Sequence, residues 1–163
     1  MATKETIYTK DVANKKMKVV REFDAPVEKV WRAWTESELL DQWWAPKPWK
    51  AKTVSRNFSN GNTWIYYMEG PEGTRHYCRA DFSNIQPQKS FIVLDAFCDE
   101  KGKINEDMPR TTWKIEFFPG KEGSRVEIEL SYRSAADLEK IIEMGFKEGF
   151  AAALNNLDEL LAK

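Results

Sequence analysis

Hydrophobic and polar positions first alternate along this chain and then recur at helical spacing. Over residues 16–23 the side chains fall into two alternating sets, one that begins with Met17 and one that begins with Lys18. This alternation predicts a first β-strand. Pro26 suits the first position of a helix, because its ring fixes φ near the helical value and its missing N–H is not needed there. The apolar residues that follow keep three- and four-residue spacing: Val27, Val30, Trp31 and Trp34.

A second short helix is predicted directly after the first. Thr35-Glu36-Ser37-Glu38 has the pattern of a capping box, in which two side chains satisfy free amides at the start of a helix. We expect this helix to carry Leu39, Leu40 and Trp43. Two prolines then end it.

Three tryptophans stand close together in the segment DQWWAPKPW, residues 41–49. Trp43 continues the apolar positions of the helix, so we expect it to be buried. Adjacent residues near a helix end point about 100° apart, so Trp44 or Trp49 should be the more accessible ring. The segment either plugs one end of the core or lines the entrance of a cavity.

From residue 50 to residue 132 the pattern becomes that of strands separated by turns. Six strands are predicted, at residues 50–58, 63–69, 74–85, 89–98, 110–118 and 124–132. Turn sequences separate them, among them Gly70-Pro71-Glu72-Gly73 and Pro119-Gly120-Lys121-Glu122-Gly123. The last two strands alternate most clearly, which predicts one dry and one wet face for the sheet.

The chain is predicted to end in one long helix over residues 134–162, with Ser134 at a box-like start. The order of elements has no strand-helix-strand alternation, which disfavours a parallel doubly wound sheet. It predicts instead a single α+β domain over residues 16–163, in which the terminal helix covers a seven-stranded antiparallel sheet. Residues 1–15 are polar and aperiodic, which predicts an arm that is extended or disordered until it meets a sheet edge.

Charge and composition exclude several classes of partner. The 25 Lys and Arg residues are interspersed with 26 Asp and Glu residues, so we expect no nucleic-acid partner. The chain has no bilayer-length apolar run and no signal or transit pattern, so we expect a cytoplasmic location and no membrane partner. Two cysteines and one histidine give neither a disulfide framework nor metal-ligand spacing, so we expect no metal and no cofactor.

Three motifs, in order, resemble the SRPBCC (START-like) superfamily: REFDAPVEKVWRAWTESELLDQWWAP, GPEG and MGFKEGF. Within it, the chain is similar over about residues 16–162 to small bacterial homologues of the C-terminal domain of the heat-shock-protein-90 ATPase activator. The resemblance implies a helix-grip fold, in which a curved antiparallel sheet wraps around the C-terminal helix with an apolar cavity between them. Members include lipid and hormone carriers, polyketide cyclases, ring-hydroxylating subunits and co-chaperones, so the fold leaves the chemistry open.

Aromatic residues make up 13% of the sequence, and many of them would face the terminal helix. We expect a cavity for a small apolar or aromatic molecule between sheet and helix. Its predicted lining consists of Trp44, Trp64, Tyr66, Met68, His76, Trp113, Phe117, Met144, Phe146, Gly149 and Phe150. The alternative is that these residues pack as a filled core.

Two glycines are predicted to lie inside the terminal helix, at Gly145 and Gly149. Each costs about 1 kcal/mol relative to alanine in a helix, which calls for a compensating reason. That reason is a close approach to the helix, either by the sheet or by a ligand.

The leading hypothesis is a ligand-binding protein without catalytic residues. One alternative is a module that contacts a chaperone, and another is a cyclase-like enzyme with His76 or Asp95 as its base. Alternation places His76 and Asp81 on opposite faces of their strand, which disfavours a pair between them. Cys78 and Cys98 are predicted to be unreactive thiols. The exposed sheet edges fit either a monomer or a homodimer.

Overall fold

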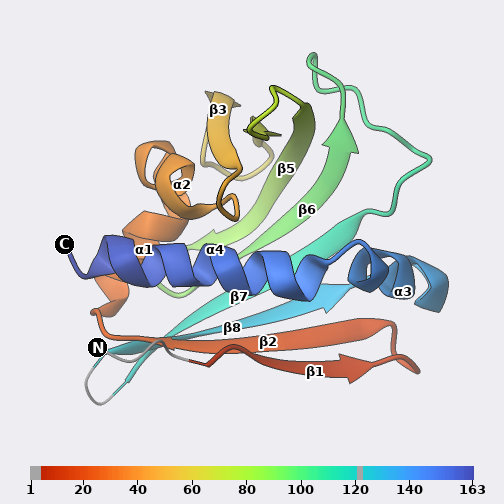
Figure 1. Ribbon diagram of the computed structural model, residues 1–163. Helices are drawn as coiled ribbons and strands as arrows, with labels where there is room; N and C mark the ends of the chain where they lie inside the picture. Colours follow the sequence, from red (N-terminus) through yellow and green to blue (C-terminus); the bar gives the residue numbers. More distant parts are fainter. Residues whose placement is uncertain (1–4, 121–122) are drawn as a thin grey trace.

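The computed structural model describes residues 5–120 and 123–163. These residues form one antiparallel sheet of eight strands in the order β1-β2-β8-β7-β6-β5-β4-β3. The strands are β1 (Ile7–Asp11), β2 (Lys16–Phe23), β3 (Lys50–Arg56), β4 (Thr63–Glu69), β5 (Arg75–Gln86), β6 (Ser90–Cys98), β7 (Thr111–Pro119) and β8 (Ser124–Ser131). The helices are α1 (Val27–Thr35), α2 (Ser37–Trp43), α3 (Ala135–Glu143) and α4 (Phe146–Leu161). α4 crosses the curved sheet, with α1 and α2 towards one end of α4 and α3 at the other (Figure 1).

The predicted α+β helix-grip architecture is confirmed, and the alternating segments form strands. β2 and β4 have the predicted bounds, and the other predicted strands differ by no more than two residues at either end. Two residues of one predicted turn, 121 and 122, lie outside the described residues. Only glycine fits at Gly123 in that turn, because a Cβ there would lie 2.1 Å from the carbonyl oxygen of Phe23.

The sheet has one strand more than predicted, because part of the polar arm forms β1. β1 pairs antiparallel with β2, with Ile7 opposite Val20. The Tyr8 hydroxyl also donates a hydrogen bond of 2.8 Å to the carbonyl of Lys147 at the start of α4. β1 is exposed along most of its length, so its sequence carries no alternation that would predict a strand. Residues 1–4 of the predicted arm lie outside the described residues.

The predicted starts of α1 and α2 need correction. Pro26 precedes α1 as its N-cap residue, in an extended conformation, instead of occupying the first helical position. The capping box does not form, because the buried Thr35 hydroxyl donates to the carbonyl of Trp31 at 2.8 Å. α2 therefore starts at Ser37, with Glu36 as an N-cap residue that makes no side-chain capping bond.

The predicted terminal helix is divided into two helices at Gly145. This residue has a φ of 90°, a left-handed conformation that ends the path of α3 and lets α4 begin in a new direction. The structural reason for Gly145 is thus its backbone conformation, since a Cβ there would meet nothing within 4 Å. The predicted start of α3 is confirmed, because Ser134 Oγ accepts a hydrogen bond of 3.1 Å from the amide of Asp137.

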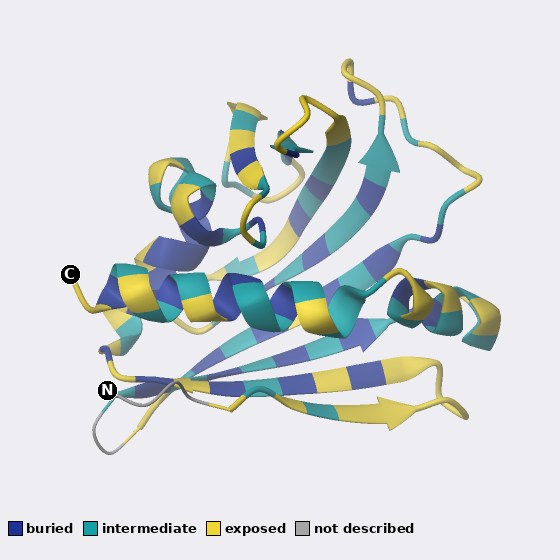
Figure 2. Cartoon of the chain, viewed as in Figure 1, coloured by how far each residue is buried: buried dark blue, intermediate teal, exposed yellow. Residues whose placement is uncertain are grey.

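The core lies between the concave face of the sheet and the helices. Buried positions alternate along β7 and β8 and form a stripe along α4 (Figure 2). Trp43 is 1% exposed and its Nε1 donates to the Ala33 carbonyl, so its predicted burial is confirmed. Arg21 is also buried on this face, where it forms an ion pair with Asp158 of α4. Among the described residues, no helix is both long and apolar enough to cross a bilayer.

Candidate ligand-binding site

A pocket of about 390 Å³ lies between the sheet and the junction of α3 with α4. We call it the apolar pocket, because hydrocarbon and aromatic side chains form most of its wall. Its lining consists of Trp44, Pro46, Tyr66, Met68, His76, Cys78, Asp95, Ala96, Phe97, Thr111, Trp113, Ile141, Met144, Gly145, Phe146, Gly149 and Phe150. Strands β4 to β7 therefore supply one wall, and the two C-terminal helices supply the other.

Most of the predicted lining residues are brought together in the apolar pocket: Trp44, Tyr66, Met68, His76, Trp113, Met144, Phe146, Gly149 and Phe150. Trp64 and Phe117 are not among its lining residues. Trp64 is 4% exposed and stacks on Tyr66, with ring centroids 4.0 Å apart. Phe117 packs against Trp31 of α1, which fills the space in front of it. Contact between the other nine residues and a ligand stays a prediction.

Aromatic rings hold one another in place along the pocket wall. The ring of Trp113 meets Phe146 and Phe150 edge to face, at centroid distances of 5.9 and 5.5 Å. Phe146 and Phe150 lie one helical turn apart on α4 and stack at 5.3 Å. Such packing fixes the orientation of each ring, so the wall is largely preformed.

The two tryptophans at the end of α2 have different environments, as predicted. Trp43 is buried, whereas Trp44 is partly exposed and borders the apolar pocket. Trp44 Nε1 donates a hydrogen bond of 2.9 Å to the hydroxyl of Tyr66, which joins the loop after α2 to β4. Trp49 is also partly exposed and stacks on the exposed ring of His76, with centroids 5.3 Å apart.

Asp95 on β6 places a carboxyl group in this apolar wall. Its Oδ2 accepts a hydrogen bond of 2.6 Å from Trp113 Nε1, and its Oδ1 accepts one of 3.0 Å from the amide of Thr111. Burial raises the pKa of Asp95 to about 6, although these two hydrogen bonds and the charge of Arg110 favour the ionised form. From the sequence, Asp95 is predicted only as a possible base, and the signal for it is an acidic residue within the apolar run of β6.

Two further groups in the pocket wall, the Tyr66 hydroxyl and the Cys78 thiol, are neutral near pH 7. Burial raises the pKa of Tyr66 well above its ordinary value and that of Cys78 to about 12, and the Tyr66 hydroxyl hydrogen bonds with the Cys78 thiol. A thiol with so high a pKa is a poor nucleophile. Asp81 binds Arg79 and Arg110 instead of His76. Within residues 5–120 and 123–163, no group of three His, Cys, Asp or Glu residues is arranged to hold a metal ion.

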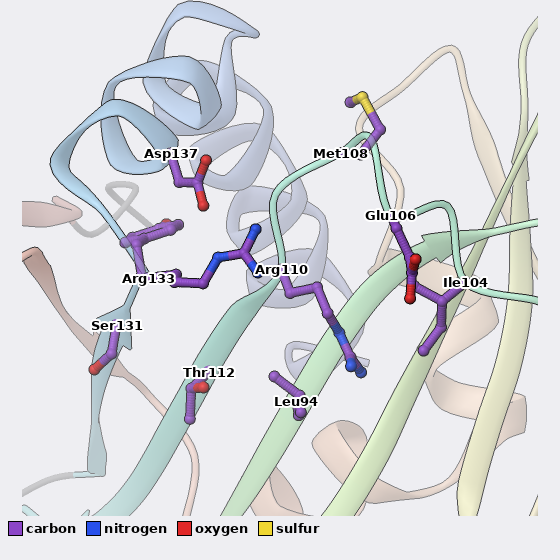
Figure 3. Close-up of a pocket in the computed structure, with 10 residues that line it drawn as sticks. Leu94, Ile104, Glu106, Met108, Arg110, Thr112, Ser131, Arg133 and Asp137 are labelled. Carbon is purple, nitrogen blue, oxygen red and sulfur yellow. The ribbon is translucent and has the colours of Figure 1, made fainter.

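A second pocket, of about 690 Å³, lies between the segment after β6 and the start of α3. Its lining consists of Leu94, Ile104, Glu106, Met108, Arg110, Thr112, Ser131, Tyr132, Arg133 and Asp137. Figure 3 shows that Arg110 and Arg133 reach towards this space from different strand ends, with Glu106 and Asp137 beside it. Opposite charges are thus mixed in its wall. None of the predicted site residues lies there.

Comparison with known proteins places the chain in a family. The profile described as "Activator of Hsp90 ATPase homolog 1-like protein" matches residues 24–162. A solution structure of a protein from Arthrobacter aurescens is 31% identical, with a TM-score of 0.90 over 96% of this chain and 91% of that one. A crystal structure of a protein from Mycobacterium smegmatis is 28% identical, with a TM-score of 0.88 over 96% and 97% of the two chains.

A protein from Nitrosomonas europaea is similar as well, at 29% identity and a TM-score of 0.80, covering 92% of this chain and 96% of that one. The comparison with curated proteins gave no significant match. The match to the family profile covers most of the chain, and the bacterial structures share the fold over nearly its whole length. This chain therefore belongs to the activator of Hsp90 ATPase homolog 1-like family, within the SRPBCC superfamily.

Proposed function

We propose that this protein binds a small, largely apolar molecule in the apolar pocket and does not transform it. The observation that carries the proposal is the apolar pocket itself, with a volume of about 390 Å³. If the predicted lining residues packed as a filled core, the alternative considered from the sequence, we would expect no space of this size between them. A concave site with hydrophobic and aromatic walls and a few polar groups is typical of small-molecule binding.

The rim of the pocket also supports binding of an apolar body. Met144, next to Gly145 at the helix junction, is 50% exposed although it is a large hydrophobic residue. A flexible thioether side chain adapts to ligands of different shape, and a bound molecule would remove it from water. The rings of Phe146 and Phe150 continue this surface into the pocket.

The first test is titration with 2-methylnaphthalene, followed by the total tryptophan fluorescence of the protein, to which Trp44 and Trp113 of the pocket wall contribute. We expect saturable binding of one molecule per chain. Gly149→Leu should weaken it by roughly tenfold or more, because the new side chain would occupy space at the wall of the pocket. Glu148→Leu is the matched control, since Glu148 is the exposed neighbour on α4 and does not line the pocket.

Two results would count against the proposal. The first is an absence of saturable binding by the wild-type protein. The second is equal affinity of the wild-type and Gly149→Leu proteins, with circular dichroism showing that both are folded. If binding is saturable and is weakened in Gly149→Leu, native mass spectrometry of protein purified gently from its own cells would identify a natural ligand by its mass.

The family description favours a second candidate, the activation of a heat-shock-protein-90 ATPase. The same purified protein can be added to this chaperone, and the rate of ATP hydrolysis measured. A dose-dependent increase would support the second candidate, and an unchanged rate would oppose it. Testing Gly149→Leu in this assay would show whether any activation depends on the apolar pocket.

A further inference from the structure

Asp95 gives the apolar pocket a charge of one sign. Among its described lining residues, Asp95 is the only Asp or Glu and none is Lys or Arg; the one histidine, His76, is an exposed residue whose ring stacks on Trp49. At pH 7.5, a carboxyl group with a pKa of about 6 is mostly ionised. A negative charge thus lies in a wall that is otherwise nearly all apolar.

The groups that contact this carboxylate leave its charge without an ion-pair partner. Its hydrogen-bond donors, Trp113 Nε1 and the amide of Thr111, are both neutral. Arg110 is nearby, but it donates to the Asp95 backbone carbonyl at 3.3 Å and to the Asp81 carboxylate at 3.3 Å. None of the ion pairs formed within residues 5–120 and 123–163 includes the Asp95 side chain.

Aromatic rings surround the same part of the pocket. Trp113, which binds the carboxylate directly, has its ring centroid 5.7 Å from that of Trp44 and 5.5 Å from that of Phe150. Ring faces attract cations, and a desolvated carboxylate gains most from a partner of opposite charge. A carboxylate among aromatic rings is therefore suited to an organic ammonium group.

We propose that the apolar pocket selects a molecule with an apolar or aromatic body and one protonated amine, whose ammonium group lies against Asp95. The same charge disfavours a carboxylate ligand of equal shape, because two like charges would share a site of low dielectric. This inference rests on the proposed function, since it names the class of molecule that the pocket takes.

The test compares three probes with the same naphthalene body at pH 7.5: 2-naphthylmethylamine, 2-naphthylmethanol and 2-naphthoate. Their dissociation constants are measured by isothermal titration calorimetry. We expect the amine to bind roughly tenfold or more tightly than the alcohol, and the carboxylate to bind most weakly. Equal affinities for amine and alcohol, or tightest binding of the carboxylate, would overturn the inference.

Two variants connect the preference to Asp95. Asp95→Asn keeps the size of the side chain and removes its charge, so the ratio of amine to alcohol affinity should fall close to one. Glu148→Gln removes a negative charge from α4, at an exposed residue that does not line the apolar pocket, and should leave the ratio unchanged. A ratio that survives in Asp95→Asn would contradict the assignment. If Asp95→Asn does not fold, the order of the three probes on the wild-type protein decides alone.

Failure of this inference differs from failure of the proposed function. If 2-methylnaphthalene and all three charged and uncharged probes fail to bind, the pocket is not a binding site and both proposals fall. If the neutral probes bind and the amine has no advantage, only the preference for a cation is lost.

Discussion

Burial of Asp95 has a direct consequence for stability. Its pKa rises from 3.8 to about 6 because burial disfavours the charged form, which the hydrogen bonds from Trp113 and Thr111 offset only in part. Between these two values the folded state holds a proton that the unfolded state has lost. The free energy of unfolding therefore falls as pH rises through this window.

We predict that Asp95→Asn removes this dependence. The free energy of unfolding of the wild-type protein minus that of the variant should fall by about 2 kcal/mol between about pH 4 and pH 7, as measured by urea unfolding. Tyr66 and Cys78 lie nearby, but their raised pKa values keep them neutral over this range. A difference that is independent of pH would show that the carboxyl group is not desolvated.

Asp81 is the control with the opposite sign. Burial raises its pKa, but hydrogen bonds from Arg79 and Thr63 and the charge of Arg110 together bring the pKa below 3.8. The stability that Asp81 contributes is thus present above its unfolded pKa and is lost as pH falls. The same difference measured for Asp81→Asn should therefore increase as pH rises through the acidic range.

Among the elements, the strands could be predicted from the sequence, whereas the starts of α1, α2 and α4 could not. In β8 every second residue is buried, so local alternation contains the information that defines the strand. The hydroxyl of Thr35 could form a cap or bond back to Trp31, and the choice depends on burial by residues distant in sequence. Gly145 fits a helix by spacing, and only its φ of 90° shows the break.

The two C-terminal glycines provide a prediction about α3 and α4. Gly145→Ala should lower the free energy of unfolding by about 1 kcal/mol, because an L-residue is strained at a left-handed φ. Gly149→Ala should raise it by up to about 1 kcal/mol, because alanine favours a helix and its Cβ would lie 3.8 Å from Pro46, an ordinary contact. Urea unfolding measures both values. Two changes of the same sign would contradict the different roles assigned to the glycines.

Helix α4 is joined to the sheet by an ion pair that can be compared with an exposed one. Asp158 pairs with Arg21, which is 1% exposed, whereas Glu159 pairs with Lys47 at a site where both side chains are about two-thirds exposed. We predict that Asp158→Asn lowers the free energy of unfolding by about 3 kcal/mol, because it leaves a buried guanidinium unpaired. Glu159→Gln should change it by less than about 0.5 kcal/mol. Equal losses in thermal or urea unfolding would contradict this difference.

For the molecule as a whole, the sequence predicts which layers face each other, whereas the extent of the space between them depends on contacts between elements distant in sequence. Tyr66 and Trp113 both border the apolar pocket, and the alternation along their strands explains why, since every second residue of a strand shares a face. Phe117 shares that face with Trp113 but lies further along β7, where Trp31 covers it. The environment of Asp95 depends on its hydrogen-bond donors Thr111 and Trp113 on β7, which the sequence of β6 does not contain.

The apolar pocket lies between the C-terminal helices and the sheet, so a bound ligand should change the rate of local opening in both layers next to it. We predict that saturating 2-methylnaphthalene slows amide hydrogen exchange in residues 141–150 and in β6, because local opening there would have to release the ligand. β1 is the control: it lies at the far edge of the sheet, and amides that exchange there by local opening should keep their rates. Hydrogen exchange followed by mass spectrometry of peptides measures these regions separately. Slowing in β1 or around Arg133, without slowing in residues 141–150, would place the bound molecule outside the apolar pocket.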